Sequence, residues 1–81
     1  MEYEIKVNKF ENDNVRGLVT VTFDKCFAVG NIKIIEGKNG LFVAMPSYKN
    51  KAGKYTDIAF PVTKEFREQL FADILSEYEK L

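Results

Sequence analysis

The apolar residues of this chain change their spacing near residue 62, and that change limits the folds that the chain can adopt. In the earlier part they recur at every second position, as Tyr3, Ile5 and Val7 do, which is typical of half-buried β-strands. From Thr63 onward they recur every four positions, which is typical of one face of an α-helix. Strands followed by one helix predict an α+β domain in which the helix packs on an antiparallel sheet.

Turn-forming residues divide the first part of the chain into a predicted antiparallel meander of about five strands. Residues 11–14 (Glu-Asn-Asp-Asn), 24–25 (Asp-Lys) and 36–40 (Glu-Gly-Lys-Asn-Gly) have the chemistry of reverse turns. Gly30 stands where the alternation changes phase, which predicts a β-bulge or bend. The expected strands cover residues 2–8, 15–23, 27–34, 41–45 and 55–60, with a loop at 46–54 and with Pro61 ending the last strand.

The C-terminal segment predicts one amphipathic helix packed on this sheet. Its apolar face is expected to consist of Phe66, Leu70, Phe71, Ile74, Leu75 and Tyr78. Thr63 is a plausible N-cap, and Glu65 suits the positive first turn of a helix. The aromatic residues of the strand region are expected to lie in the core, because each falls within an apolar alternation: Phe10, Phe23, Phe27, Phe42 and Phe60.

The length of 81 residues predicts a single domain, residues 1–81, with a thin core that could lean on a second copy of the chain. Apolar residues make up 46% and charged residues 30%, as in soluble globular domains. No apolar run is long enough to cross a bilayer, and the start MEYEIKVNKF lacks the features of a secretion signal. We therefore expect a cytoplasmic protein with no membrane partner.

The residues offer little for catalysis or metal binding. The chain has no histidine, which removes the commonest general base and the commonest metal ligand. Cys26 is the only cysteine, and we expect it to pack as a small apolar residue. The best acid-base candidates are Asp57 and Tyr55, but no spacing matches a known catalytic motif. We expect no enzyme, no cofactor, no metal and no small-molecule substrate.

The charge distribution favours a polyanionic partner. The formal net charge is zero, yet residues 25–54 carry six basic side chains and one acidic one, a net charge of +5. Lys49, Lys51 and Lys54 lie in one expected loop, where they could contact phosphates or simply be solvated. Tyr48 and Tyr55 flank these lysines and could stack on bases or lie at a strand edge with their hydroxyls in water. Because lysine is a point charge, strong sequence specificity is not expected.

The segment IKIIEGKNGLFVAMPSYKNKAGKYTDIAFPV, followed by a helix ending in EYEKL, closely resembles the bacterial SpoVG family of septation and sporulation proteins. The resemblance begins with YEIKVNKF and LVTVTFDKCFAV, and NGLFVAMPS with DIAFP is its most specific part. It implies a homodimeric regulator that binds DNA and also RNA and acts on cell division, capsule, virulence or sporulation genes. The family's contact region implies binding by Lys49, Lys51 and Lys54 of the loop, and by Lys64 and Arg67 of the helix.

The chain departs from the family pattern at a few positions near this loop. The family usually has two basic residues after AMPS, where this chain has Tyr48 and Lys49. The chain also has Ala52 in place of an aspartate, Thr56 in place of an arginine, and Phe60 in place of a histidine. These differences concern sequence preference more than binding itself. The alternative function is a protein-interaction module that uses a sheet edge or an acidic helix face, formed by Glu65, Glu68, Asp73, Glu77 and Glu79.

Overall fold

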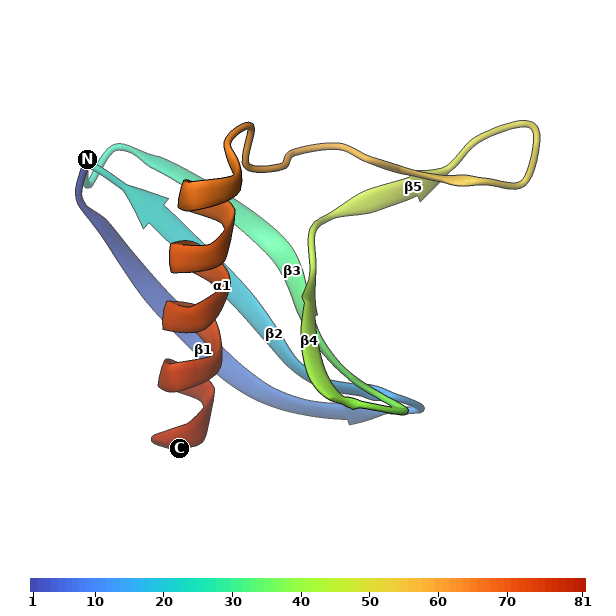
Figure 1. The fold of residues 1–81 in the computed structure, drawn as a ribbon, viewed down its shortest axis with the longest axis horizontal. Coiled ribbons are helices and arrows are strands. Elements are labelled where there is room, and N and C mark those ends of the chain that lie inside the picture. Colours follow the sequence, from blue (N-terminus) through green and yellow to red (C-terminus); the bar gives the residue numbers. More distant parts are fainter.

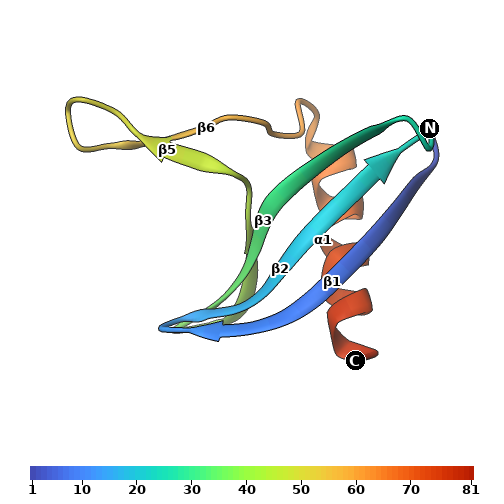
Figure 2. The same ribbon diagram turned by 180° about the vertical axis from the view of Figure 1, so that it is seen from behind.

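Helix α1 lies across one face of a four-stranded antiparallel sheet in the computed structural model, which describes residues 1–81 (Figure 1). The opposite face of the sheet is left uncovered (Figure 2), and we call it the open face. The strands of the sheet follow one another in the order β1-β2-β3-β4. The elements are β1 (Tyr3–Asn12), β2 (Val15–Phe23), β3 (Phe27–Gly37), β4 (Gly40–Ala44), β5 (Ser47–Lys49), β6 (Tyr55–Asp57) and α1 (Lys64–Glu79). The predicted α+β class, with an antiparallel meander and one C-terminal helix, is confirmed.

The three predicted turns join the four strands where the sequence places them. Asp13 has a φ of 55° between β1 and β2, and Asp24 and Lys25 have φ of 49° and 58° between β2 and β3. Gly37 pairs with Gly40 across the third turn, where Gly40 has a φ of 116°. Left-handed backbone is accessible to glycine and, among other residues, most readily to asparagine and aspartate. The turn residues therefore specify the strand register.

The change of phase at Gly30 is a β-bulge, as predicted. Val19 pairs with Ile32 and Val21 with Val29, so that two residues of β3, Gly30 and Asn31, stand opposite one residue of β2. Asn31 has a φ of 58°. The extra residue returns the following apolar positions of β3 to the face that α1 covers.

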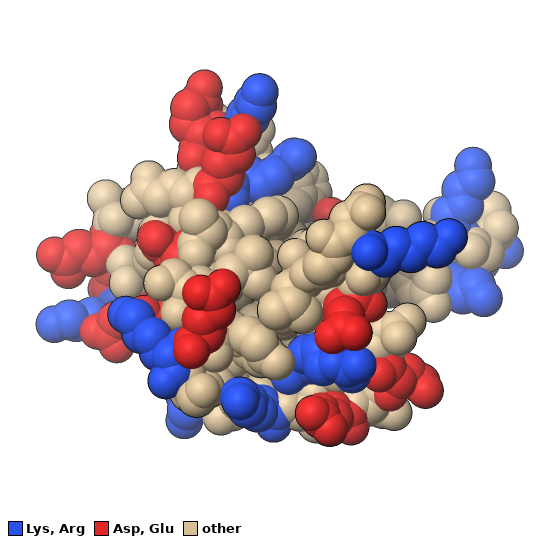
Figure 3. Space-filling view, turned by 60° about the horizontal axis from the view of Figure 1, so that its bottom comes forward, with Lys and Arg blue, Asp and Glu red and all other residues tan.

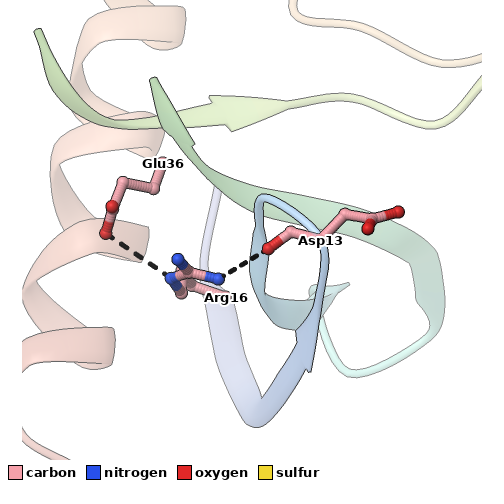
Figure 4. Close-up of polar contacts among 3 residues, drawn as sticks. All are labelled: Asp13, Arg16 and Glu36. Atoms are coloured by element: carbon pink, nitrogen blue, oxygen red, sulfur yellow. Dashed lines mark hydrogen bonds and ion pairs between the residues drawn. The ribbon is translucent and has the colours of Figure 1, made fainter. Parts of the chain in front are cut away.

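Arg16 connects the first hairpin to the end of β3. Its Nη1 donates to the backbone carbonyl of Asp13 at 2.8 Å, and its Nε lies 3.5 Å from the Oε1 of Glu36 (Figure 4). Its guanidinium is therefore held by contacts within the sheet. Arg67, on α1, is the second arginine of the chain and has no ion-pair partner.

The core lies between the sheet and α1 and consists of seven buried apolar side chains: Val19, Val21, Ile32, Ile34, Val43, Leu70 and Ile74. Leu70 and Ile74 are one turn apart, and both are at most 1% exposed. The other residues of the predicted helix face, Phe66, Phe71, Leu75 and Tyr78, pack around this cluster. Thr63 caps the helix as predicted, because its Oγ1 accepts from the backbone N–H of Phe66 at 3.3 Å.

Tyr3 joins the start of β1 to α1. Its ring makes edge contacts with Phe23 and Phe66, with ring centroids 6.0 and 5.8 Å away. Its hydroxyl donates to the Oδ2 of Asp73 at 2.6 Å and accepts from the Nε2 of Gln69 at 3.3 Å. Burial, followed by the hydrogen bond and the charge of Asp73, raises the pKa of the Tyr3 hydroxyl above its usual value.

The expected fifth strand does not join the sheet. Only residues 55–57 of the expected strand 55–60 form a strand, β6, so Pro61 does not end it, and β6 pairs only with β5. β5 itself lies within residues 46–54, which were expected to be a loop. Pro46 follows β4 and has no N–H to donate to a ladder, so the chain leaves the sheet there. We call residues 47–57 the hairpin arm. It projects away from both the sheet and α1 (Figure 1).

The expected burial of the aromatic residues and of Cys26 is largely wrong. Only Phe23 packs against the core, whereas the others are exposed: Phe10 by 42%, Phe27 by 65%, Phe42 by 48% and Phe60 by 57%. Phe42 lies on the open face, which no helix covers, and Phe60 lies outside the sheet. Phe27 points to the same face as its pair partner Phe23 but is the first residue of β3, at the end of the sheet. Cys26 is also exposed, because the pairing of Phe23 with Phe27 leaves it in the turn.

Candidate nucleic-acid interface

The hairpin arm carries four of the six residues predicted to bind nucleic acid. Tyr48 and Lys49 belong to β5, and Lys51 and Lys54 belong to the segment that joins β5 to β6. The arm is held by three cross-strand pairs: Ser47 with Asp57, Tyr48 with Thr56, and Lys49 with Tyr55. The structure therefore brings these four predicted residues together on one element that stands clear of the core.

The end of the arm is organised by Asn50. Its Oδ1 accepts from the backbone N–H groups of Ala52 and Lys54, at 2.9 and 3.0 Å. Its own N–H donates to the carbonyl of Lys54 at 2.8 Å, and its carbonyl accepts from Gly53 at 3.0 Å. Gly53 has a φ of 82°, which glycine adopts without strain. The backbone that carries the lysines is thus fixed by its own hydrogen bonds.

Asn50 was not among the residues that the sequence singled out. Asparagine is a turn-forming residue because its side chain bonds backbone groups two or more residues ahead. An asparagine three positions before a glycine, between two lysines, is the pattern from which this role could have been inferred. It is a positioning residue, since it acts on the lysines through the backbone.

The three arm lysines are exposed and have no ion-pair partner. No acidic residue occurs between Glu36 and Asp57, so the only carboxylate of the arm is that of Asp57, at the base of the arm. In the space-filling view, lysine side chains gather at the end of the arm without acidic neighbours (Figure 3). The end of the arm is therefore a positively charged projection on a molecule of zero formal net charge.

The two tyrosines of the arm lie on opposite faces of it. Directly paired residues of two antiparallel strands point to the same face, so Tyr55 shares a face with Lys49 and Tyr48 shares the other with Thr56. Tyr48 is 52% exposed and Tyr55 is 75% exposed. Both rings are available for stacking, although only Tyr48 is among the predicted site residues.

Lys64 and Arg67 lie on α1 and are not part of the arm. The Nζ of Lys64 is 4.0 Å from the Oε1 of Glu68, and both side chains are largely exposed. Arg67 lines a hollow of about 310 Å³ at the base of the arm, together with Asp57 and Ser47. The structure thus brings Arg67 next to the base of the arm and leaves Lys64 on the first turn of the helix.

The groups weighed for catalysis are both on the arm. Asp57 and Tyr55 are exposed at the ends of β6. No group of three or more carboxylate or cysteine side chains is arranged to hold a metal ion. The structure contains no helix that is both long enough and apolar enough to span a bilayer.

Comparison with known proteins places the chain in one family. The sequence model described as SpoVG matches residues 1–80. A putative septation protein SpoVG of Caldicellulosiruptor saccharolyticus is 44% identical over 77 residues, which cover 94% of this chain and 88% of that protein. Proteins of the same name from Clostridium perfringens and Thermoanaerobacter pseudethanolicus are 46% and 47% identical over 79 and 78 residues. These matches cover 96% and 95% of this chain, and 88% and 85% of the two proteins. The family model matches nearly every residue, and relatives that are 44% and 46% identical carry the name of the same family. This chain therefore belongs to the SpoVG family.

Proposed function

We propose that this protein is a homodimeric, cytoplasmic regulator of bacterial gene expression that binds DNA and RNA through the hairpin arm. The observation that carries the proposal is the set of three exposed, unpaired lysines on a hydrogen-bonded turn that stands clear of the fold. The names of its relatives suggest that the regulated processes include septation. Sporulation and virulence are the further processes that the family resemblance implies.

The physical basis of binding is the release of counterions from phosphates. Each lysine that neutralises a phosphate frees a condensed cation, so affinity falls as salt rises. An arm lysine breaks no ion pair with a carboxylate when it contacts a phosphate. The contact therefore costs little free energy. Lys64 is less suited to this role because it already lies near Glu68.

Dimer formation is supported by what the single chain leaves exposed. Its core contains only seven buried apolar side chains, while Phe27 and Val62 are each at least 65% exposed. The sheet also ends in two unpaired edges, β1 and β4. A second copy could cover such surfaces and would give the assembly two arms, whose joint binding gains from effective concentration. Light scattering on the purified protein measures the mass directly.

The alternative, a protein-interaction module, has a narrower basis in the structure. Three of the five carboxylates of the proposed acidic helix face already have partners within the chain. Asp73 accepts from Tyr3, Glu68 lies near Lys64, and Glu77 pairs with Lys80. The exposed sheet edges remain suited to a partner strand, so this alternative now rests on β1 and β4.

The proposal is tested by fluorescence-anisotropy titrations of labelled duplex DNA, single-stranded DNA and RNA at several salt concentrations. The variant replaces Lys49, Lys51 and Lys54 by glutamine. On duplex DNA each lost contact lowers the slope of log affinity against log salt by about 0.9, so the variant loses up to about 2.7 units. Affinity should fall to a similar extent on every sequence tested, because phosphates are the same in all of them.

The matched control replaces Lys6, Lys25 and Lys80 by glutamine, which makes the same change in net charge outside the arm. We expect the control to bind as the parent does, apart from a small long-range effect. Equal loss in both variants would mean that net charge, and not the arm, governs binding. Parent protein that binds none of the three probes at low salt would refute the proposal.

A further inference from the structure

We propose that the hollow between the hairpin arm and the open face of the sheet receives an unstacked base of a single-stranded nucleic acid. This inference rests on the proposed function and specifies its ligand, since the site would favour single strands over duplexes. The hollow has a volume of about 580 Å³ and lies where the chain leaves β4 to form the arm. Its walls come from two separate parts of the fold, the sheet and the arm.

The lining of the hollow matches the chemistry of a nucleotide. Ile35 and Ala44, from the open face, form an apolar wall, and Ile58 adds a side chain that is 64% exposed. Tyr55 contributes an aromatic ring that is 75% exposed. Lys33, which carries a positive charge, also lines the hollow. A nucleobase has apolar faces, which suit the tyrosine and the aliphatic wall, and is joined to a phosphate, which suits the lysine.

Tyr55 connects the hollow to the lysines of the arm. Tyr55 lines the hollow and is paired with Lys49 across the two strands of the arm, on the same face. Lys33 is on the opposite side, in β3. A strand held by phosphates at the end of the arm would therefore pass Tyr55 on its way to Lys33. This arrangement, cations along a path with an aromatic ring between them, is how proteins bind single strands with little sequence preference.

The other hollows of the molecule have a different lining. The hollow beside Arg67 also contains Asp57, whose charge repels phosphate. The hollow between β1 and α1 is lined by Glu4, Asp73 and Glu77. The hollow next to Phe60 is almost wholly apolar and contains no charged side chain. Other hollows also combine a cationic side chain with an aromatic ring, but each of those contains a carboxylate as well. The hollow of Lys33 and Tyr55 combines the two without any carboxylate in its lining.

A duplex would use this hollow poorly. Its bases are stacked and paired, so a base enters a pocket only after extrusion from the helix, which costs free energy. A single strand has bases that are already free to leave the stack. The end of the arm can still meet the phosphates of a duplex, so duplex binding should persist without any contribution from the hollow.

The test compares parent and Tyr55→Leu binding to three labelled probes of the same length. The probes are a mixed-sequence single-stranded DNA, a single strand of abasic sites, and a duplex. Because stacking on an aromatic ring strengthens binding of a base severalfold to about a hundredfold, we expect the parent to bind the base-bearing strand about tenfold more tightly than the abasic strand. In Tyr55→Leu this ratio should fall to about twofold or less, with duplex affinity unchanged.

Two further variants keep the result interpretable. Ile58→Ser changes the hollow without touching the strands of the arm, and should also reduce the preference for base-bearing strands. Lys33→Gln should lower the salt slope on single strands by about 0.7 and leave the duplex slope unchanged. Phe60→Leu is the control, because Phe60 is an exposed aromatic residue, at 57%, that does not line this hollow. NMR signals of the Ala52 and Lys54 amides report whether the arm stays folded in each variant.

The outcomes separate this inference from the proposed function. Equal affinity of the parent for abasic and base-bearing strands, with salt dependence intact, would overturn the hollow as a base site and leave binding by the arm standing. Equal weakening of duplex and single strand by Tyr55→Leu, with the arm folded, would do the same. Absence of salt-sensitive binding to all three probes would overturn both. Loss of the base preference in Tyr55→Leu and Ile58→Ser, but not in Phe60→Leu, supports the inference.

Discussion

Replacing Asn50 by alanine separates the shape of the hairpin arm from its charge. The substitution removes the Oδ1 that accepts from the backbone N–H groups of Ala52 and Lys54, at 2.9 and 3.0 Å, and changes no charge. A hydrogen bond contributes about 0.5–1.5 kcal/mol net to stability, and these two are exposed, so we take the lower half of the range. The free energy of opening the turn should therefore fall by about 1–2 kcal/mol.

The effect should stay local. The arm pairs only with itself and contributes none of the seven core side chains, so its opening does not require the sheet to unfold. We expect the amides of Ala52 and Lys54 to exchange with solvent about 5- to 30-fold faster in Asn50→Ala, while the thermal midpoint changes little. Nucleic-acid affinity should fall severalfold with an unchanged salt slope, because the lysines remain but are no longer held in one arrangement.

Hydrogen exchange measured by NMR on parent, Asn50→Ala and Asn50→Asp decides the matter. Asn50→Asp keeps an acceptor oxygen, so its amides should stay protected, while its added negative charge weakens binding. Asn8→Ala is the control, since Asn8 is an exposed asparagine of β1 whose side chain makes no hydrogen bond. Unchanged exchange of Ala52 and Lys54 in Asn50→Ala would show that the turn is held by the backbone alone, and the positioning role of Asn50 would be refuted.

Two predictions concern the fold. Ile74→Ala removes a side chain that is fully buried against the sheet and should cost about 2–5 kcal/mol, with a fall in thermal midpoint of at least about 10 °C that Ser76→Ala does not produce. A calorimetric difference of a few degrees would mean that the helix contributes less than its burial indicates. Tyr3→Phe removes a hydroxyl whose folded-state pKa is raised. Because the fold favours the protonated hydroxyl, this contribution is complete below the unfolded-state pKa and is lost as pH rises toward the folded-state pKa. Urea unfolding should therefore show the stability advantage of the parent over Tyr3→Phe shrinking above about pH 10, and an advantage that grows there would contradict the assignment.

Turn residues and hydrophobic periodicity are local features of the sequence, and they predicted the turns, the β-bulge and the helix cap. The left-handed turn at Asp13, the bulge at Gly30 and the cap at Thr63 each depend on residues within a few positions. The partner of a strand is not a local property. The segment from Tyr55 alternates as a strand should, but whether it pairs with β4 or with β5 depends on where the chain goes after Pro46.

The exposure of the phenylalanines was unpredictable for a related reason. Alternation shows which residues share a face of a strand, but not which face a helix will cover. Phe42 lies on the open face, opposite Ile35, and is 48% exposed although it stands in an almost wholly apolar run. The arm lysines could be singled out from the sequence because charge is visible there, whereas the hydrogen bonds of Asn50 and the position of Lys33 beside a hollow exist only in the folded chain.

The buried core and the exposed arm lie in different parts of the chain, so family membership does not predict the properties of both equally well. Stability depends on the sheet and α1, whose buried residues lie outside the arm. Three departures from the family pattern, Tyr48, Ala52 and Thr56, all lie in the arm and are exposed. Substitutions there change the charge and shape of the arm without disturbing the packing that holds the sheet and helix together. Family membership therefore predicts the fold of this chain more strictly than it predicts the surface of the arm, where three exposed positions depart from the family pattern.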